Sequence, residues 1–170
     1  WYEHNGFTHE ATEHALSASD FERAAQLIQA QADVSWQRGE HGKLRRWLPK
    51  LPHDILFSRP HLGIYHAWYL FAGGQHETAA QILEVTEQVL NIDSNRSTTL
   101  KKTHLRGKIA AIRAFMSSYQ GDAPGIIHHA RQALEDLPEQ DSVWRNICAI
   151  VLGDAYGFTG DMAAAYKTRL

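Results

Sequence analysis

The feature of this sequence that most constrains its fold is a short polar stretch centred on glycine, which recurs along the chain at roughly the period of helical-hairpin repeats. Its central glycines, called tip glycines below, are Gly6, Gly39, Gly74, Gly121 and Gly160. Glycine suits the end of a helix because the closing residue often adopts a left-handed backbone conformation. The recurrence therefore predicts helices that reverse direction at each tip glycine.

Between the tips, apolar residues recur at helical spacing. This periodicity predicts helices over residues 20–37, 61–72, 78–90, 99–119, 123–137 and 142–158. Asp20 is expected to cap the first of these. Loop-forming residues gather at 49–54, 58–60, 91–97 and 137–141. No stretch combines strand alternation with strand-rich composition, so the sequence predicts an all-α fold of about ten helices.

A second regularity is a small residue seven positions before each of the last four tips. These residues are Ala32, Ala67, Ala114 and Gly153, and a small side chain there lets the two helices of a hairpin approach closely. With Ala79, Leu83, Ala133 and Pro138, the pattern resembles the tetratricopeptide repeat (TPR). The resemblance implies one TPR-like domain over residues 1–170, a right-handed superhelix of stacked helical hairpins (an α-solenoid). Its units are expected at roughly 1–19, 20–53, 54–96, 97–140 and 141–170.

The start of the chain carries a more specific resemblance. The phrase "WYEHNGFTHEATEHALSASDFERAAQLI" (Trp1–Ile28) is similar to the segment that follows the ATPase module in the large ATP-binding LuxR-type regulators, the MalT-like or maltose-regulator family. Residues 45–68 and 160–165 are similar to that family as well. The resemblance implies the cytoplasmic sensor or interaction module of an ATP-dependent transcriptional regulator, a fragment of a longer protein. A generic TPR-type scaffold for protein–protein interaction stays open as the alternative.

The resemblance also implies which partners to expect. The phosphate-binding motif G-x-x-x-x-G-K-[ST] is absent, because Gln37 and Leu44 replace its first glycine and its Ser/Thr around Gly42-Lys43. No cofactor is therefore expected here, and ATP belongs to a missing upstream module. The net charge of −2 gives no electrostatic footprint for nucleic acid, and no apolar run is long enough for a membrane span. The expected partners are a small-molecule inducer, or a protein or peptide in the concave groove, and other domains of the same chain.

No motif indicates an enzyme or a metal site. His9 and His14 are five positions apart, whereas paired helical ligands lie at i and i+4. His128 and His129 are adjacent, which indicates a surface or packing role. Cys148 stands in an apolar run and is expected in the core. The one basic cluster is expected to form a solvated helix face: Lys101, Lys102, Arg106 and Lys108.

The inward positions of TPR-like stacks fall six, three and two positions before each tip glycine. Applied here, these offsets include Asp33 and Phe158 and give the candidate residues for an effector or partner groove: Trp36, Trp68, Phe71, Phe115, Tyr119 and Asp154. Aromatic walls with a few polar groups are typical of small-molecule and peptide sites. Asp154 is expected to be the polar anchor.

Overall fold

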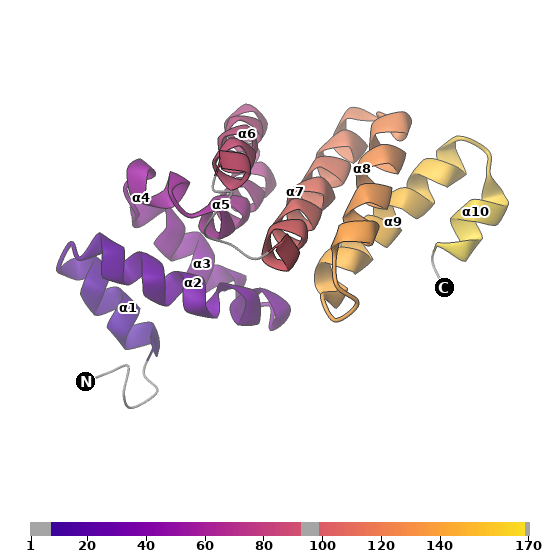
Figure 1. Ribbon diagram of the computed structural model, residues 1–170. Helices are drawn as coiled ribbons and strands as arrows, with labels where there is room; N and C mark the ends of the chain where they lie inside the picture. Colours follow the sequence, from indigo (N-terminus) through magenta and orange to yellow (C-terminus); the bar gives the residue numbers. More distant parts are fainter. Residues whose placement is uncertain (1–7, 93–98, 169–170) are drawn as a thin grey trace. The chain divides into compact units, whose positions relative to one another are not determined.

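The computed structural model describes residues 8–92 and 99–168 of the chain (Figure 1). Gly6, the first predicted tip, lies outside the described residues. The chain divides into two compact units, Trp1–Ile92 and Asp93–Leu170. Each unit is described by itself below.

The first unit contains six α-helices and a 3₁₀ turn among its described residues. They are α1 (Thr8–Ser17), α2 (Phe21–Gln37), α3 (His41–Trp47), η2 (Leu48–Lys50), α4 (His53–Phe57), α5 (Pro60–Ala72) and α6 (His76–Ile92). Helix α2 packs against α1, α3 and α5, and α5 packs against α6 (Figure 1).

The second unit contains four α-helices among its described residues. They are α7 (Thr99–Gln120), α8 (Ala123–Asp136), α9 (Ser142–Phe158) and α10 (Met162–Lys167). Helix α9 packs against both members of the α7–α8 hairpin, and α10 packs against α9 (Figure 1). No strand occurs within residues 8–92 or 99–168, so the predicted all-α fold is confirmed. The continuous right-handed superhelix stays a prediction.

Four of the predicted tips have the geometry that their sequence predicts. Gly39, Gly74, Gly121 and Gly160 have φ of +70°, +84°, +69° and +82°. In each case the residue after the glycine donates its N–H to the carbonyl five positions before that residue. Asp122 donates to Ser117 at 3.0 Å, and Gln75 donates to Leu70 at 2.9 Å. This bond satisfies a carbonyl that the helix end would leave without a partner. The chain therefore reverses at these glycines.

A fifth turn has the same geometry without a glycine. Ser19, between α1 and α2, has φ of +57°, and the N–H of Asp20 donates to the carbonyl of Ala15 at 2.9 Å. The Asp20 side chain then accepts from the N–H of Arg23, which confirms the predicted cap of α2. The glycine pattern does not predict this turn, because a serine occupies the left-handed position.

The predicted loop at residues 49–54 is partly wrong. Residues 48–50 form the 3₁₀ turn η2, and the short helix α4 begins at His53. Pro49 lies in the first turn of η2, where its missing N–H costs no hydrogen bond. Leu48, Leu51 and Leu56 are buried. The gain from burying these side chains outweighs the loop-forming tendency of the two prolines.

The small residues seven positions before the last four tips are buried. Ala32, Ala67 and Ala114 have no exposed surface, and Gly153 is buried on α9. Cys148 is also buried, and this burial raises the pKa of its thiol to about 12. It therefore belongs to the core, as predicted. Among the described residues, no helix has the length and apolar character needed to cross a bilayer.

The prediction that the basic cluster is a solvated face is wrong for Lys108. Its side chain is 2% exposed, and its Nζ lies 3.9 Å from Oδ2 of the buried Asp141. His104 Nε2 lies 2.6 Å from the same carboxylate oxygen. A buried ammonium group requires a countercharge. Lys108 therefore pairs across the unit with the residue that precedes α9, whereas Lys101 of the same cluster is exposed.

Replacing a tip glycine should cost backbone energy and no packing energy. A Cβ at Gly121 would meet nothing within 4 Å, so we expect Gly121→Ala to destabilise the protein by about 1–2 kcal/mol, the cost of a left-handed L-residue. Gly157 offers a matched control, because its Cβ would also meet nothing, but its backbone is helical. Gly157→Ala should stabilise the protein by about 0.5–1 kcal/mol in urea unfolding. Equal effects of the two substitutions on the free energy of unfolding would contradict a backbone cost specific to the left-handed position.

Removing the countercharge of Lys108 should destabilise the second unit strongly. We expect Asp141→Ala to cost about 3–5 kcal/mol, as breaking other buried ion pairs does. The double variant Lys108→Met/Asp141→Leu should recover most of this loss, because it removes both charges together. Equilibrium unfolding of the three proteins measures both effects. A double variant no more stable than Asp141→Ala would show that the pair is not the source of the loss.

Candidate functional site

Trp36 and four aromatic side chains around it in the first unit are called the Trp36 cluster here. The other members are His41 on α3 and Tyr65, Trp68 and Tyr69 on α5, with ring centroids 4.9, 5.6, 5.4 and 6.3 Å from that of Trp36. Trp68 meets Trp36 at 88°, an edge-to-face contact that aromatic pairs favour. The cluster therefore joins α2, α3 and α5 through one buried indole.

The hairpin geometry explains why these residues meet. Trp36 lies in the last turn of α2, three positions before Gly39, and the chain reverses there so that His41 begins α3 beside it. Tyr65, Trp68 and Tyr69 lie at i, i+3 and i+4 on α5, which places them on one helical face. Because α5 packs against α2, this face meets Trp36.

One edge of the cluster is polar and carries a carboxylate. Asp33 Oδ1 accepts a hydrogen bond from the Tyr65 hydroxyl and lies 3.0 Å from His61 Nε2. The side chain of His61 is 13% exposed and that of Asp33 is 44% exposed. The carboxylate is thus fixed by two largely buried groups while part of it faces solvent. Such an acceptor can orient a ligand that carries a hydrogen-bond donor.

A second polar pair of the cluster is a hydroxyl and an imidazole. The Tyr69 hydroxyl lies 3.1 Å from His41 Nδ1, and burial raises the pKa of Tyr69. The phenol therefore keeps its proton at neutral pH, where it can donate as well as accept.

A hollow of about 190 Å³ adjoins the cluster and shares Tyr69 with it. This volume is below that of a typical drug-sized pocket, so the hollow can take one group of a ligand. Burial, and to a lesser extent His53, lowers the pKa of His66, so this lining imidazole is neutral at pH 7. The hollow is lined by Arg45, Leu48, Pro49, His66, Tyr69, Leu70, Gly73 and Gln75.

The structure brings some of the predicted groove residues together within each unit. Trp36 and Trp68 touch, and Phe71, which is buried, stacks on His76 at 4.5 Å between centroids. In the second unit, Phe115 and Tyr119 lie 5.9 Å apart on α7, and Tyr119 is 67% exposed.

Asp154 is half-buried on α9 in the second unit. Its role as a polar anchor stays a prediction, as does a groove that contains all six residues. In the first unit, Asp33 is the carboxylate beside the aromatic side chains.

Four residues of the site lie outside the set that the sequence predicts: His41, His61, Tyr65 and Tyr69. A signal for three of them was present, because His61, Tyr65, Trp68 and Tyr69 follow helical spacing at i, i+4, i+7 and i+8. The offsets from the tip glycines include Trp68 but not its neighbours on the same face. His41 lies beyond the tip, where those offsets do not reach.

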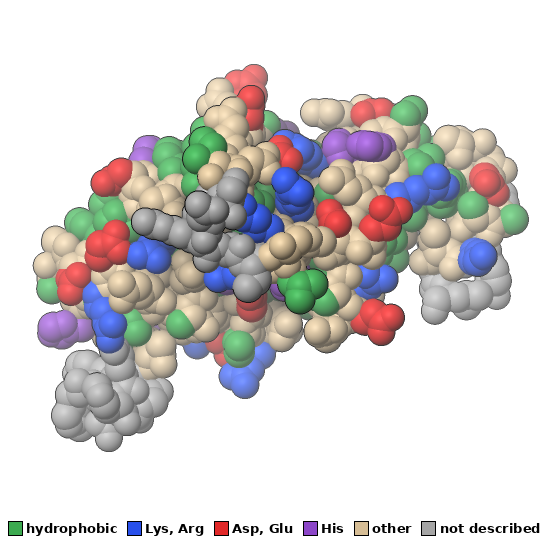
Figure 2. All heavy atoms as spheres, in the orientation of Figure 1, with side chains coloured by type: hydrophobic (Ala, Val, Ile, Leu, Met, Phe, Trp, Pro, Cys, Tyr) green, Lys and Arg blue, Asp and Glu red, His purple; other side chains and the backbone are tan. Residues whose placement is uncertain are grey.

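Metal chemistry finds no support in the described part of the chain. Nowhere in residues 8–92 and 99–168 do three or more side chains of His, Cys, Asp or Glu gather as a metal site would need. On the face that Figure 2 shows, acidic and basic side chains are interspersed along the described residues.

These features define an all-α chain of helical hairpins with an aromatic cluster beside a fixed carboxylate. Comparison with known proteins finds similarity to bacterial transcriptional regulators. The HTH-type transcriptional regulator MalT of Klebsiella pneumoniae is 26% identical over 157 residues, which are 92% of this chain and 17% of that protein. The MalT proteins of Serratia proteamaculans and Yersinia pestis are 26% and 25% identical over 160 residues, 94% of this chain and 17% of each relative.

The similarity relates the chain to MalT-like regulators, as the phrase Trp1–Ile28 predicts. The chain spans about a sixth of the length of these relatives. No protein-family model matches the chain. No solved structure matches it either.

The neutral, buried His66 should make the first unit sensitive to acid. Its folded-state pKa lies below the ordinary value of 6.5, so below that pH the unfolded chain binds more protons than the folded one. This contribution to stability is therefore present above pH 6.5 and is lost as the pH falls through the folded-state pKa. We expect His66→Gln to reduce the loss of stability between about pH 7.5 and pH 5.5. Urea unfolding at both pH values checks this, and an unchanged difference would contradict it.

Proposed function

We propose that this chain is the sensing region of an ATP-dependent, MalT-like LuxR-type transcriptional regulator that works in the cytoplasm. The observation that carries the proposal is the similarity to MalT regulators, which extends over 92% of the chain. The repeated hairpins support it, because stacked helical hairpins offer large surfaces for ligands and partner proteins. On this proposal the region is not an enzyme. Nucleotide binding and DNA binding belong to other parts of a longer regulator.

The Trp36 cluster is the proposed sensing site. A small molecule or a peptide would pack on the half-buried Trp68 and donate a hydrogen bond to Asp33. It would then contact both α2 and α5, the two helices that the cluster joins. A ligand shifts a switch only by binding one state more tightly than the other. Binding across this helix contact provides that difference if α2 and α5 sit differently in the resting and active states.

The test uses the full-length protein encoded by the parent gene and a reporter gene under a promoter that this protein controls. A screen of candidate small molecules and peptides supplies the effector. We expect an effector to raise reporter output in the wild type, and Trp68→Ala to shift its dose response by about tenfold or more, the loss of one well-packed aromatic contact. Phe57→Ala is the matched control, because Phe57 is a half-buried aromatic residue of α4 outside the cluster. It should respond like the wild type.

Two outcomes would contradict the proposal. One is a parent gene that encodes neither a nucleotide-binding module nor a helix-turn-helix. The other is a folded Trp68→Ala protein whose dose response equals that of the wild type, which would remove sensing from the Trp36 cluster.

A further inference from the structure

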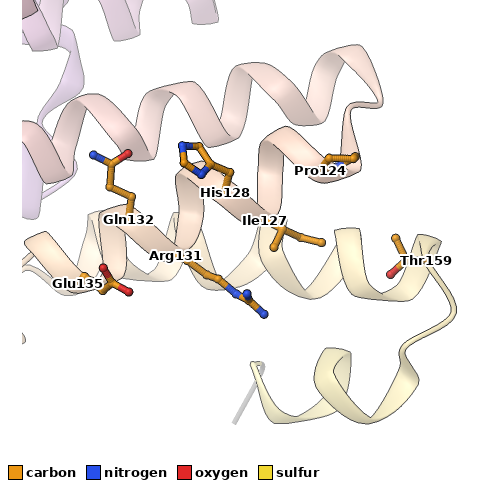
Figure 3. Close-up of a pocket in the computed structure, with 7 residues that line it drawn as sticks. All are labelled: Pro124, Ile127, His128, Arg131, Gln132, Glu135 and Thr159. Atoms are coloured by element: carbon orange, nitrogen blue, oxygen red, sulfur yellow. The ribbon is translucent and has the colours of Figure 1, made fainter.

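The second unit has a hollow of its own along α8 (Figure 3). Its volume is about 640 Å³, within the range of small-molecule sites. The lining residues of α8 follow helical spacing from Pro124 to Glu135, and Thr159 contributes from the end of α9. In Figure 3 Thr159 and Glu135 lie toward opposite ends of the hollow, with Arg131 between them.

Arg131 is held in place by a neutral partner. Its Nε and Nη2 both donate to the Tyr156 hydroxyl, at 3.0 and 2.5 Å, and its guanidinium carbon lies 5.8 Å from the centroid of the Tyr156 ring. Tyr156 is 9% exposed on α9. A buried phenol therefore fixes the plane of the guanidinium and leaves its other N–H groups for a ligand.

The charge of Arg131 is not neutralised within the described part of the chain. No carboxylate of residues 8–92 or 99–168 lies within ion-pair distance of it, although Glu135 lines the same hollow one turn further along α8. Arginine binds carboxylates and phosphates well because its planar fork can donate two parallel hydrogen bonds to them. An oriented arginine without a countercharge in a hollow therefore favours an anion.

The other residues that line the hollow indicate which uncharged parts a ligand could have. Ile127 and Pro124 give an apolar wall, and His128, Gln132 and Thr159 add hydrogen-bonding groups around it. The Glu135 carboxylate would repel a negatively charged group at its end of the hollow, and it can accept a hydrogen bond from a ligand hydroxyl.

We propose that this hollow binds a small organic anion, a carboxylate or a phosphate monoester, through Arg131, with its apolar body against Ile127. The site shares no residue with the Trp36 cluster, and it does not depend on the regulatory function proposed above. Tyr156 acts as a positioning residue that holds the guanidinium.

The experiment titrates the full chain with phenyl phosphate, benzoate and the neutral benzyl alcohol, and follows the side-chain Nε–Hε resonance of Arg131 by NMR. We expect a saturable shift with at least one of the two anions and none with benzyl alcohol. The anion that binds more tightly identifies the ligand class. Arg131→Gln should weaken that anion by about tenfold or more, the value of a lost charge-assisted hydrogen bond, as measured by calorimetry.

Two further variants keep the result specific. Tyr156→Phe keeps the ring and removes the hydroxyl, so the anion should bind several-fold more weakly while the fold is retained. Arg38→Gln removes an exposed arginine at the end of α2 and should bind like the wild type. Equal affinity of wild type and Arg131→Gln, or no saturable binding of either anion up to about 10 mM, would overturn the proposal.

Discussion

The structure depends on one backbone constraint, a single residue in the left-handed conformation that closes a helix and turns the chain. It occurs at four glycines and at Ser19 in the described residues. Each time, the following N–H bonds to the carbonyl five positions back, so the reversal is fixed to one residue. At Asp20, Asp122 and Asp161 that following residue also caps the next helix through its carboxylate. One short turn thus ends one helix, starts another and sets the register between them.

That register decides which side chains meet. Counting back from Gly39 places Trp36 in the last turn of α2, and counting back from Gly74 places Trp68 on α5. The buried Ala32 and Ala67 leave room for neighbouring helices. The aromatic cluster and its carboxylate are therefore consequences of hairpin geometry, and a proposed ligand there would bridge two helices whose spacing small residues set.

Two positively charged side chains of the second unit differ in burial, and this difference gives them different roles. Lys108 lies in the core, where an ammonium group without a countercharge would be costly, and the carboxylate of Asp141 stands beside it. Arg131 lies at the surface in a hollow and is held by the neutral hydroxyl of Tyr156. The first arrangement stabilises the contact between α7 and the start of α9. The second leaves a fixed positive charge that a ligand can use.

The sequence alone predicts the six longest helices, four left-handed turns and the relation to MalT-like regulators, because helical periodicity, glycine at the turn and the phrase Trp1–Ile28 are local signals. It also selected Trp36 and Trp68 by counting from the tips. It did not reveal the turn at Ser19, the helix α4 or the partners of Lys108 and Arg131. Each of these features depends on what packs against it. They are a serine in a left-handed conformation, buried leucines beside prolines, and pairs of residues far apart in sequence. These features become visible only in the folded chain, because burial and long-range contacts set their energies and local preference does not.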